Sequence, residues 1–387
     1  MNSVKKFDVL IVYSGSLADS ASSISGKISA PFSKESGKEN YNIVYSYFLE
    51  DCWKNNLKAA FSTSSDIIGT GMVKSYWIFE DKVWKRIQGK GYSKIIFDKF
   101  SPTNKEKVTK RDLLFSSKKI RPFNRPSLFD LCFDKQKTYN KLSKFAIPTV
   151  TIKSVTKKGI HDAVSLLGKE IVKHKHEGDF SNKIVMKDRF GAGGINVYKF
   201  EAGQEDLMSV LIKKHKNISF IIQPLVEFDK GFIYKNSSVS TDIRLIYLGS
   251  TLVQTYIRMA KKGSFRCNEH SGGLLKYIQT NEIPLKVLSA SHDVAKIIDN
   301  KSSLIALDFI VSNRGNVYLL EANSGPGLDW NLSMKENEVE AKKLIRVIIK
   351  EIVKRTGISN TSLKRKNAAS IDNVSDYSVT PNILITV

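Results

Sequence analysis

The sequence predicts a mixed α/β (α+β) protein, and three kinds of pattern support this fold class. Strand-like and helix-like segments alternate over about the first 120 residues, which is typical of a small α/β domain. Later in the chain, apolar runs occur in pairs with turn residues between them, as in β-hairpins. Other segments have the apolar spacing of amphipathic helices. The 387 residues suffice for two or three domains with a substantial core.

An N-terminal α/β domain is predicted over residues 1–125. Pro122 and Pro126 mark the linker at its end, within a basic stretch that runs from Lys105 to Arg125. The elements expected are a buried strand at 7–13, a Gly/Ser-rich loop at 14–36, a helix at 45–60, a strand-like patch at 66–68, a hairpin at 76–87 with its turn at 80–82, and a strand at 94–100.

A larger unit is predicted over residues 126–355, with a small middle part at about 148–226 and a C-terminal part at about 227–355. The polar segment 356–387 is predicted to be a mobile tail. The elements expected are a helix at 134–145 that stops before Pro148, a helix at 160–176 with Ala163, Leu166, Leu167 and Ile171 as its apolar stripe, a strand–loop–strand unit at 183–200, a strand at 220–228, a hairpin at 241–260 with its turn at 248–250, a helix at 285–299, a hairpin at 304–327 and a helix at 335–355.

Composition limits the class of protein and its compartment. With 41% hydrophobic and 26% charged residues, the chain has the composition of a globular protein. No apolar run approaches the ~18 residues of a membrane span, and the run that follows Lys6 is too short for a signal peptide. The cysteines, at 52, 132 and 267, lack the spacing of a disulfide framework or a zinc site. We therefore expect a reduced, cytoplasmic setting and no membrane partner.

The formal net charge of +23 allows two interpretations. A basic surface attracts polyanions, which would include nucleic acid, ribosomes, acidic peptides and nucleotides. Alternatively, the charge reflects a general excess of Lys, which occurs in almost every segment. No RNP1, zinc-finger or helix-turn-helix pattern accompanies the charge, so no motif supports a nucleic-acid partner.

The hairpin at 304–327 carries a predicted metal site. With Arg314–Gly315 as a two-residue turn, the pairing places Asp308 opposite Glu321. The period of two places Glu321 and Asn323 on one face of the returning strand, together with Leu319. Opposed carboxylates destabilise a strand pair unless a cation lies between them, and such oxygen donors suit Mg²⁺. The alternative is a hairpin whose acidic residues face solvent.

A glycine-bearing loop follows the strand that ends near Lys187. Because no Gly-Lys-Ser/Thr ends the loop and no helix follows, it is not a Walker A motif. Gly191, Gly193 and Gly194 leave backbone N–H groups accessible, so the loop is predicted to cover phosphates. A plain turn is the alternative for a GAGG sequence alone.

The order of these features resembles the ATP-grasp ligases and, within them, the RimK-like branch that joins amino acids to carboxylates. The likeness extends from Asp134 to about Trp330, which is about half of the chain. It is carried by the strings DKQKT, IPT, IVMK, GAGG, DIR, RMAKKGSFRCN, SGG, LDFI and EANSGPGL. The resemblance implies an N-terminal α/β pre-ATP-grasp domain and an ATP-grasp domain that clamps ATP between two sheets.

The resemblance also implies roles for individual residues. Pro224 replaces the acidic residue usual at the adenine hinge, and Glu227 is a candidate to compensate for it. His270 is a candidate base for the incoming amine, with a structural role as the alternative. The implied roles are phosphate binding by Lys135 and Lys187, cover of the phosphates by Gly191, Gly193 and Gly194, the adenine hinge at Gln223, Leu225 and Val226, ribose binding by Asp242, charge neutralisation by Arg258, Arg266 and Asn268, and Mg²⁺ binding by Asp308, Glu321 and Asn323, with Mn²⁺ as an alternative metal.

The function implied is an ATP-dependent ligase that forms an amide through an acyl phosphate. Such chemistry requires positioning and charge neutralisation more than a protein nucleophile, which agrees with a site of Lys, Arg, Gly and Mg²⁺. The expected partners are ATP, a carboxylate acceptor and an amine donor, which include an acidic peptide or protein; a homo-oligomer is left open. The alternatives are a kinase on the same scaffold, or a catalytically weak protein that binds nucleotides, RNA or ribosomes.

Overall fold

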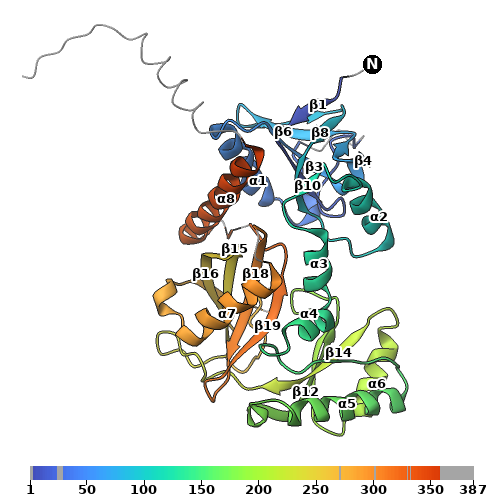
Figure 1. Ribbon diagram of the computed structural model, residues 1–387, viewed down its shortest axis with the longest axis vertical. Helices are drawn as coiled ribbons and strands as arrows, with labels where there is room; N and C mark the ends of the chain where they lie inside the picture. The colour runs from blue at the N-terminus through green and yellow to red at the C-terminus, as the bar shows by residue number, and fades with distance from the viewer. Residues whose placement is uncertain are drawn as a thin grey trace, which may run out of the picture.

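The computed structural model describes residues 3–23, 29–269, 272–299, 302–328, 330–331 and 333–357. Within them the chain forms four β-sheets with helices packed around them (Figure 1), which confirms the mixed α/β class. The predictions made for His270 and for the tail beyond 357 lie outside the described residues.

The N-terminal region contains a six-stranded sheet in the order β10-β9-β2-β3-β6-β7 and a four-stranded sheet in the order β1-β8-β5-β4. Strand β2 lies at the centre of the larger sheet, parallel to both β3 and β9. The elements are β1 (Lys5–Phe7), β2 (Val9–Tyr13), α1 (Tyr41–Lys54), β3 (Ala59–Thr63), β4 (Ile67–Gly69), β5 (Met72–Val73), β6 (Tyr76–Glu80), β7 (Val83–Ile87), β8 (Gly91–Ser93), β9 (Ile95–Lys99), α2 (Lys105–Leu114) and β10 (Arg121–Pro122).

Two predictions for this region need correction. The helix predicted at 45–60 ends at Lys54, because Asn56 adopts a left-handed conformation (φ 58°) and the residues after it form the central strand β3. The basic stretch begins with a helix, α2, whose N-cap Asn104 accepts a hydrogen bond from the backbone of Lys107. The hairpin at 76–87 is confirmed, since Asp81 and Lys82 both have positive φ in its turn.

A middle sheet in the order β11-β14-β12-β13 carries two helices on its outer face (Figure 1). All of its neighbouring strands are antiparallel. The helix stripe predicted at 160–176 is confirmed at Ala163 and Leu167 but is wrong at Leu166, which is 45% exposed. The elements are α3 (Pro126–Phe133), α4 (Lys135–Leu142), β11 (Val150–Thr151), α5 (Lys157–Val172), β12 (Phe180–Asp188), β13 (Val197–Phe200), α6 (Glu205–Lys214) and β14 (Phe220–Val226).

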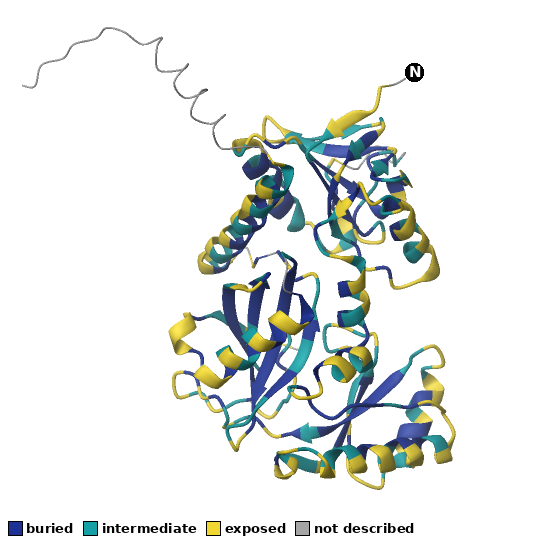
Figure 2. Cartoon of the chain, viewed as in Figure 1, coloured by how far each residue is buried: buried dark blue, intermediate teal, exposed yellow. Residues whose placement is uncertain are grey.

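The C-terminal sheet, in the order β17-β16-β15-β18-β19, is antiparallel throughout. Every residue of β18 is buried, and the strands of this sheet form the dark centre of Figure 2. Its elements are β15 (Thr241–Leu248), β16 (Thr251–Met259), β17 (Leu274–Tyr277), α7 (Leu285–Ile298), β18 (Leu304–Val311), β19 (Val317–Asn323) and α8 (Lys335–Thr356). Single-turn 3₁₀ helices lie at Lys34–Ser36, Ser64–Asp66, Glu177–Asp179 and Thr280–Glu282.

Helix α8 packs beside α1 of the N-terminal region (Figure 1), so it connects a late segment of the chain to an early one. Leu344 and Ile348 of α8 share one buried cluster with Phe48 of α1 and with Ala306 of β18. Strands β11 to β14 lie within 150–226 and strands β15 to β19 within 241–323. We keep the predicted domain boundaries as a proposal.

Candidate active site

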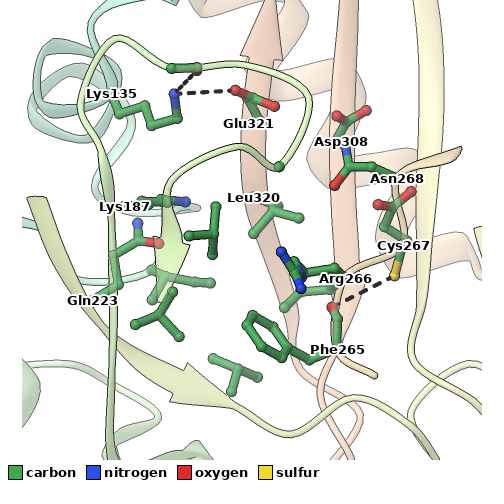
Figure 3. A pocket seen from close by; sticks show the side chains of 18 of the residues that line it. Lys135, Lys187, Gln223, Phe265, Arg266, Cys267, Asn268, Asp308, Leu320 and Glu321 are labelled. Carbon is green, nitrogen blue, oxygen red and sulfur yellow. Dashed lines mark hydrogen bonds and ion pairs between the residues drawn. The ribbon is translucent and has the colours of Figure 1, made fainter. Parts of the chain in front are cut away.

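A cavity with about 900 Å³ of space free of protein atoms lies between the middle sheet and the C-terminal sheet. Its walls come from β12, β14 and the glycine loop on one side, and from β18, β19 and residues 265–268 on the other. Figure 3 shows Lys187 and Gln223 across this cavity from Asp308 and Asn268.

The structure brings nearly all of the predicted site residues to this cavity. Asn323 is the exception, because it is absent from the lining. The predicted residues that line the cavity are Lys135, Lys187, Gly191, Gly193, Gly194, Gln223, Leu225, Val226, Asp242, Arg258, Arg266, Asn268, Asp308 and Glu321.

Two lysines lie on the same side of the cavity, close enough for the charge of one to affect the other (Figure 3). Lys187, on β12, is 8% exposed, and burial together with the charge of Lys135 lowers its pKa to about 8, against the opposing effect of Glu321. Lys135, the first residue of α4, has its Nζ 3.5 Å from Oε1 of Glu321 and also donates to the carbonyl of Gly191 (Figure 3). Two ammonium groups with a single nearby carboxylate create a positive field, which suits polyphosphate.

The loop between β12 and β13 requires glycine for two different reasons. Gly193 and Gly194 have φ values of 68° and 75°, which residues other than glycine rarely adopt. At Gly191 a Cβ atom would lie 2.8 Å from Cβ of Asp188. The loop lines the cavity with backbone close to its open space, as covering a phosphate group would require.

The part of the cavity near β14 is apolar, and sequence reasoning missed most of it. The amide of Gln223 donates to Oγ1 of Thr149 at 2.7 Å, so this side chain supports the wall. The carbonyl of Leu225 accepts from Oγ of Ser181 at 3.1 Å. The apolar residues not predicted are Ile147, Val185, Val197, Phe228, Phe265, Ile310 and Leu320. Strand alternation contained a signal for two of them, because Val185 precedes Lys187 by two and Ile310 follows Asp308 by two.

Two arginines neutralise the carboxylate of Asp308, which is fully buried. Arg244 binds it bidentately, with Nε–Oδ1 at 2.5 Å and Nη2–Oδ2 at 2.6 Å, and Arg258 adds a third bond at 2.9 Å. Burial alone would raise the pKa of Asp308, but the charges of Arg244 and Arg258 outweigh it and hold that pKa below its ordinary value. Arg258 also binds Asp242 bidentately, at 2.8 and 2.9 Å. Arg244, the arginine of the DIR string, was assigned no role from the sequence.

The predicted pairing of Asp308 with Glu321 is confirmed, although the predicted turn and the register next to it are wrong. Val311 pairs with Val317, and the backbone N–H of Ser312 donates to the carbonyl of Asn316, so three residues rather than two form the turn. Gly315 lies in this turn at φ 81°. A β-bulge between Phe309 and Asp308 restores the expected register.

The bulge also changes which leucine faces the cavity. Leu319 was predicted to share the face of Glu321, but it packs in the core with Ala322. Leu320 lies beside Glu321 in the lining instead (Figure 3). A bulge places consecutive residues on one face, which the period of two cannot predict.

The donor set at this end of the cavity fits a hard cation such as Mg²⁺. A carboxylate has about four lone-pair sites, and the arginines occupy three of those on Asp308. Glu321 retains partial exposure, 24% of its side chain. The amide nitrogen of Asn323, two strand pairs further along, is buried without a hydrogen-bond partner. Among the described residues no cluster of three or more His, Cys, Asp or Glu side chains occurs, so a metal here depends on the amide or on phosphate oxygens.

Two facing sheets, a glycine loop and a cavity of this composition define the ATP-grasp class, and comparison with known proteins identifies the family. The family model for the RimK-like ATP-grasp domain matches residues 133–348, more than half of the chain. The chain therefore belongs to the RimK-like ATP-grasp family, as its motifs predicted.

Curated relatives and solved structures agree with this assignment. A probable alpha-L-glutamate ligase of Pasteurella multocida is 28% identical over 145 residues, 38% of this chain and 42% of the relative. A second, from Haemophilus ducreyi, is 27% identical over 220 residues, 56% of this chain and 62% of the relative. The matches thus span about half the length of the curated relatives.

Among solved structures, D-cycloserine synthetase DcsG superposes with a TM-score of 0.56 at 11% identity, covering 89% of this chain and 99% of that one. D-alanyl-alanine synthetase A of Vibrio cholerae gives 0.54 at 12% identity, covering 91% and 100%. A RiPP-associated ATP-grasp ligase of Chryseobacterium gregarium, in complex with ADP and a leader and core peptide, gives 0.52 at 13%, covering 90% and 97%. At these identities the likeness shows the fold. None of the helices in the described part of the chain is both long and apolar enough to cross a bilayer.

Proposed function

We propose that the protein is an ATP-dependent carboxylate–amine ligase that forms an amide or peptide bond through an acyl phosphate. The observation that carries this proposal is the gathering in one cavity of two lysines, a glycine loop, two arginines and an opposed Asp–Glu pair. These groups serve phosphoryl transfer to a carboxylate, because that step needs positioning and charge neutralisation rather than a protein nucleophile.

Each side chain has a role that its position supports. Lys135 and Lys187 bind the phosphates of ATP, and the backbone of Gly191–Gly194 covers them. The apolar wall by β14 holds the adenine ring. Asp308, Glu321 and Asn323 would hold Mg²⁺, which supplies Lewis-acid polarisation of the phosphates.

The two arginines differ in how they can act on an acyl phosphate. The Nε and Nη2 groups of Arg258 donate to Asp242 and Asp308. Its Nη1 group makes no hydrogen bond to another described residue and is the group that could contact a ligand. Arg266, in the loop at 265–268, is exposed and lines the cavity. We therefore assign charge neutralisation on the acyl phosphate mainly to Arg266 and Asn268, with Arg258 aligning the two carboxylates.

A second cavity supports a place for the second substrate. It opens where the parallel strands β2 and β9 end, at Tyr13 and Lys99, and open parallel sheets bind ligands outside such strand ends. Its other wall is the loop that follows Asn323, where Lys99 donates to the carbonyl of Pro326 at 2.7 Å. This cavity therefore adjoins the strand that carries the proposed metal ligands.

The substrates are proposed to be an amino acid, peptide or protein, with an anionic acceptor drawn by the net charge of +23. The curated relatives are named as probable alpha-L-glutamate ligases, and one structural neighbour binds a leader and core peptide. Parts of the basic stretch have internal partners, since Arg121 donates to the carbonyl of Arg355 and Arg125 pairs with Asp299. Lys118 and Lys119 are exposed and remain candidates for contact with an acceptor.

The test is ADP release from ATP and Mg²⁺ with matched panels of carboxylate and amine substrates, followed by mass spectrometry of the products. A ligase gives an amide product and ADP in equal amounts, and its turnover depends on the amine. Glu321→Gln serves as the matched inactive protein. Amine-independent phosphorylation of a hydroxyl would instead identify a kinase, and no turnover with any acceptor would favour a binding protein.

A further inference from the structure

The glycine loop is attached to the segment α3–α4 as well as to its own sheet. Arg189, the second residue after Lys187, makes a bidentate ion pair with Asp134, with Nε–Oδ1 at 2.7 Å and Nη2–Oδ2 at 2.6 Å. The carbonyl of Arg189 accepts from the backbone of Lys135 at 3.2 Å, and the carbonyl of Gly191 accepts from the Lys135 ammonium. Three contacts therefore connect two loop residues to the start of α4.

Asp134 has two functions at once. Its side chain caps α4 by accepting from the backbone of Gln136 and Lys137, and the same carboxylate binds Arg189. Asp134 is 3% exposed, and a bidentate pair with a buried carboxylate is stronger than a surface ion pair. Because Lys135 is the next residue, the cap that fixes the start of α4 also fixes the backbone of Lys135, and the Gly191 carbonyl and Glu321 hold its ammonium group.

A row of aromatic rings extends this attachment toward the N-terminal region. Phe190 lies 5.3 Å from Phe133, which stacks on Phe129 at 4.9 Å, measured between ring centroids. The guanidinium of Arg111, on α2, lies 5.5 Å from the ring of Phe129 and pairs with Asp130 at 3.1 Å. Phe129, Phe133 and Phe190 are absent from the cavity lining, so this row supports the loop from outside.

We propose that Asp134, Arg189 and Phe190 are positioning residues that fix the glycine loop over the phosphates. The loop and Lys135 then form one rigid unit carried by α3 and α4, so nucleotide affinity depends on contacts that touch no ligand. This inference rests on the proposed function, which assigns the loop to ATP.

The decisive variants separate the ion pair from the helix cap. Asp134→Asn keeps a good N-cap but removes the charge that binds Arg189. Arg189→Gln removes the other half of the pair, and Arg189→Lys retains its charge without bidentate geometry. The matched control is Asp206→Asn, which breaks an ion pair of 2.7 Å with Lys157 between the outer helices α6 and α5, where both side chains are over 70% exposed.

Nucleotide affinity is measured on the full chain by calorimetry, with Mg²⁺ and a non-hydrolysable ATP analogue, and KM for ATP is measured beside kcat. Asp134→Asn and Arg189→Gln should each raise Kd and KM by about tenfold, with kcat within about twofold, because a loosened loop must be ordered on binding. The double variant should be no weaker than either single one, since both remove one interaction. Arg189→Lys should recover part of the affinity, and Asp206→Asn should match the wild type.

Hydrogen exchange gives a readout that does not depend on turnover. In Asp134→Asn the amides of 189–196 should exchange faster while those of β12 and β14 stay protected. A wild-type Kd in a variant that only melts at lower temperature would overturn the positioning role and leave the proposed function standing. Wild-type protein that binds no nucleotide would overturn both.

Discussion

Substitution of Asp308 by Asn should separate the metal role of this residue from its structural one. From the motif alone, Asp308→Asn and Glu321→Gln are both expected to abolish turnover and leave the fold intact. The structure changes that expectation for Asp308. Its carboxylate is fully buried and accepts three hydrogen bonds from Arg244 and Arg258. The substitution therefore leaves two largely buried guanidinium groups, of which only Arg258 keeps a carboxylate partner, Asp242.

The magnitude follows from that arrangement. Removing one member of a buried ion pair costs about 3–5 kcal/mol, because its partner stays buried without compensation. At about 2–4 °C per kcal/mol, this corresponds to a fall in Tm of roughly 6–20 °C. Glu321 is partly exposed, and the nearest cation, on Lys135, is 3.5 Å away, so Glu321→Gln should cost less than about 1 kcal/mol.

The assay is thermal and urea unfolding of both variants, with ADP formation measured in parallel. Adding Arg244→Met to Asp308→Asn should restore part of the lost stability, because it removes the surplus charge. The lowered pKa of Asp308 also implies that its contribution to stability is complete above its unfolded pKa of about 3.9 and is lost as the pH falls through the lower folded value. If Asp308→Asn unfolds at the wild-type temperature, the arginines do not depend on Asp308 and the reasoning fails.

Three further predictions concern Lys187, Gly231 and the pair Lys118 and Lys119. Burial lowers the pKa of Lys187 to about 8, so this side chain loses its positive charge between pH 7 and pH 9, and nucleotide affinity measured by calorimetry should fall over that range. Lys187→Arg should remove this pH dependence, and Lys187→Ala should weaken binding at every pH. Gly231, between β14 and β15, lies so close to Val311 that an added Cβ would be 1.9 Å from the Val311 carbonyl oxygen. Gly231→Ala should therefore destabilise the fold by about 1–3 kcal/mol in urea unfolding, and a neutral result would show that the segment between β14 and β15 can shift. Acceptor affinity should decrease as salt rises and on replacing Lys118 and Lys119 by Gln, with ATP affinity much less affected; a flat salt series would mean that the charge is compositional.

From the sequence, the residues of the candidate site were predicted more accurately than the fold that surrounds them. Motif order was sufficient to place Lys187, Glu321 and the glycines at one cavity, because each lies in a short local pattern. Arg244 received no role because its partner, Asp308, is 64 residues away and on another strand. The pairing of two distant strands is a tertiary fact that periodicity within either strand does not contain.

The errors in the predicted fold have related causes. The helix predicted at 45–60 ends early because the residues after Asn56 find a place between two strands, which overrides their local preference. Leu319 was wrongly predicted to share the face of Glu321, which Leu320 shares instead, because β19 contains a bulge. No glycine, proline or other turn residue in the sequence indicates this bulge. By contrast, the hairpin at 76–87 and the helix at 335–355 were predicted well, because turn chemistry and apolar spacing alone specify them.

The position of α8 beside α1 has a consequence for synthesis on the ribosome. Phe48 needs Leu344 and Ile348 to complete its surroundings, and these residues are translated roughly 300 codons later, a delay of about 15–60 s at 5–20 residues per second. During that interval the nascent N-terminal region exposes an apolar face of α1 that α8 covers in the folded chain. Premature termination before α8 would leave this face permanently open, so shortened chains are expected to be substrates for chaperones and proteases rather than partly active enzymes.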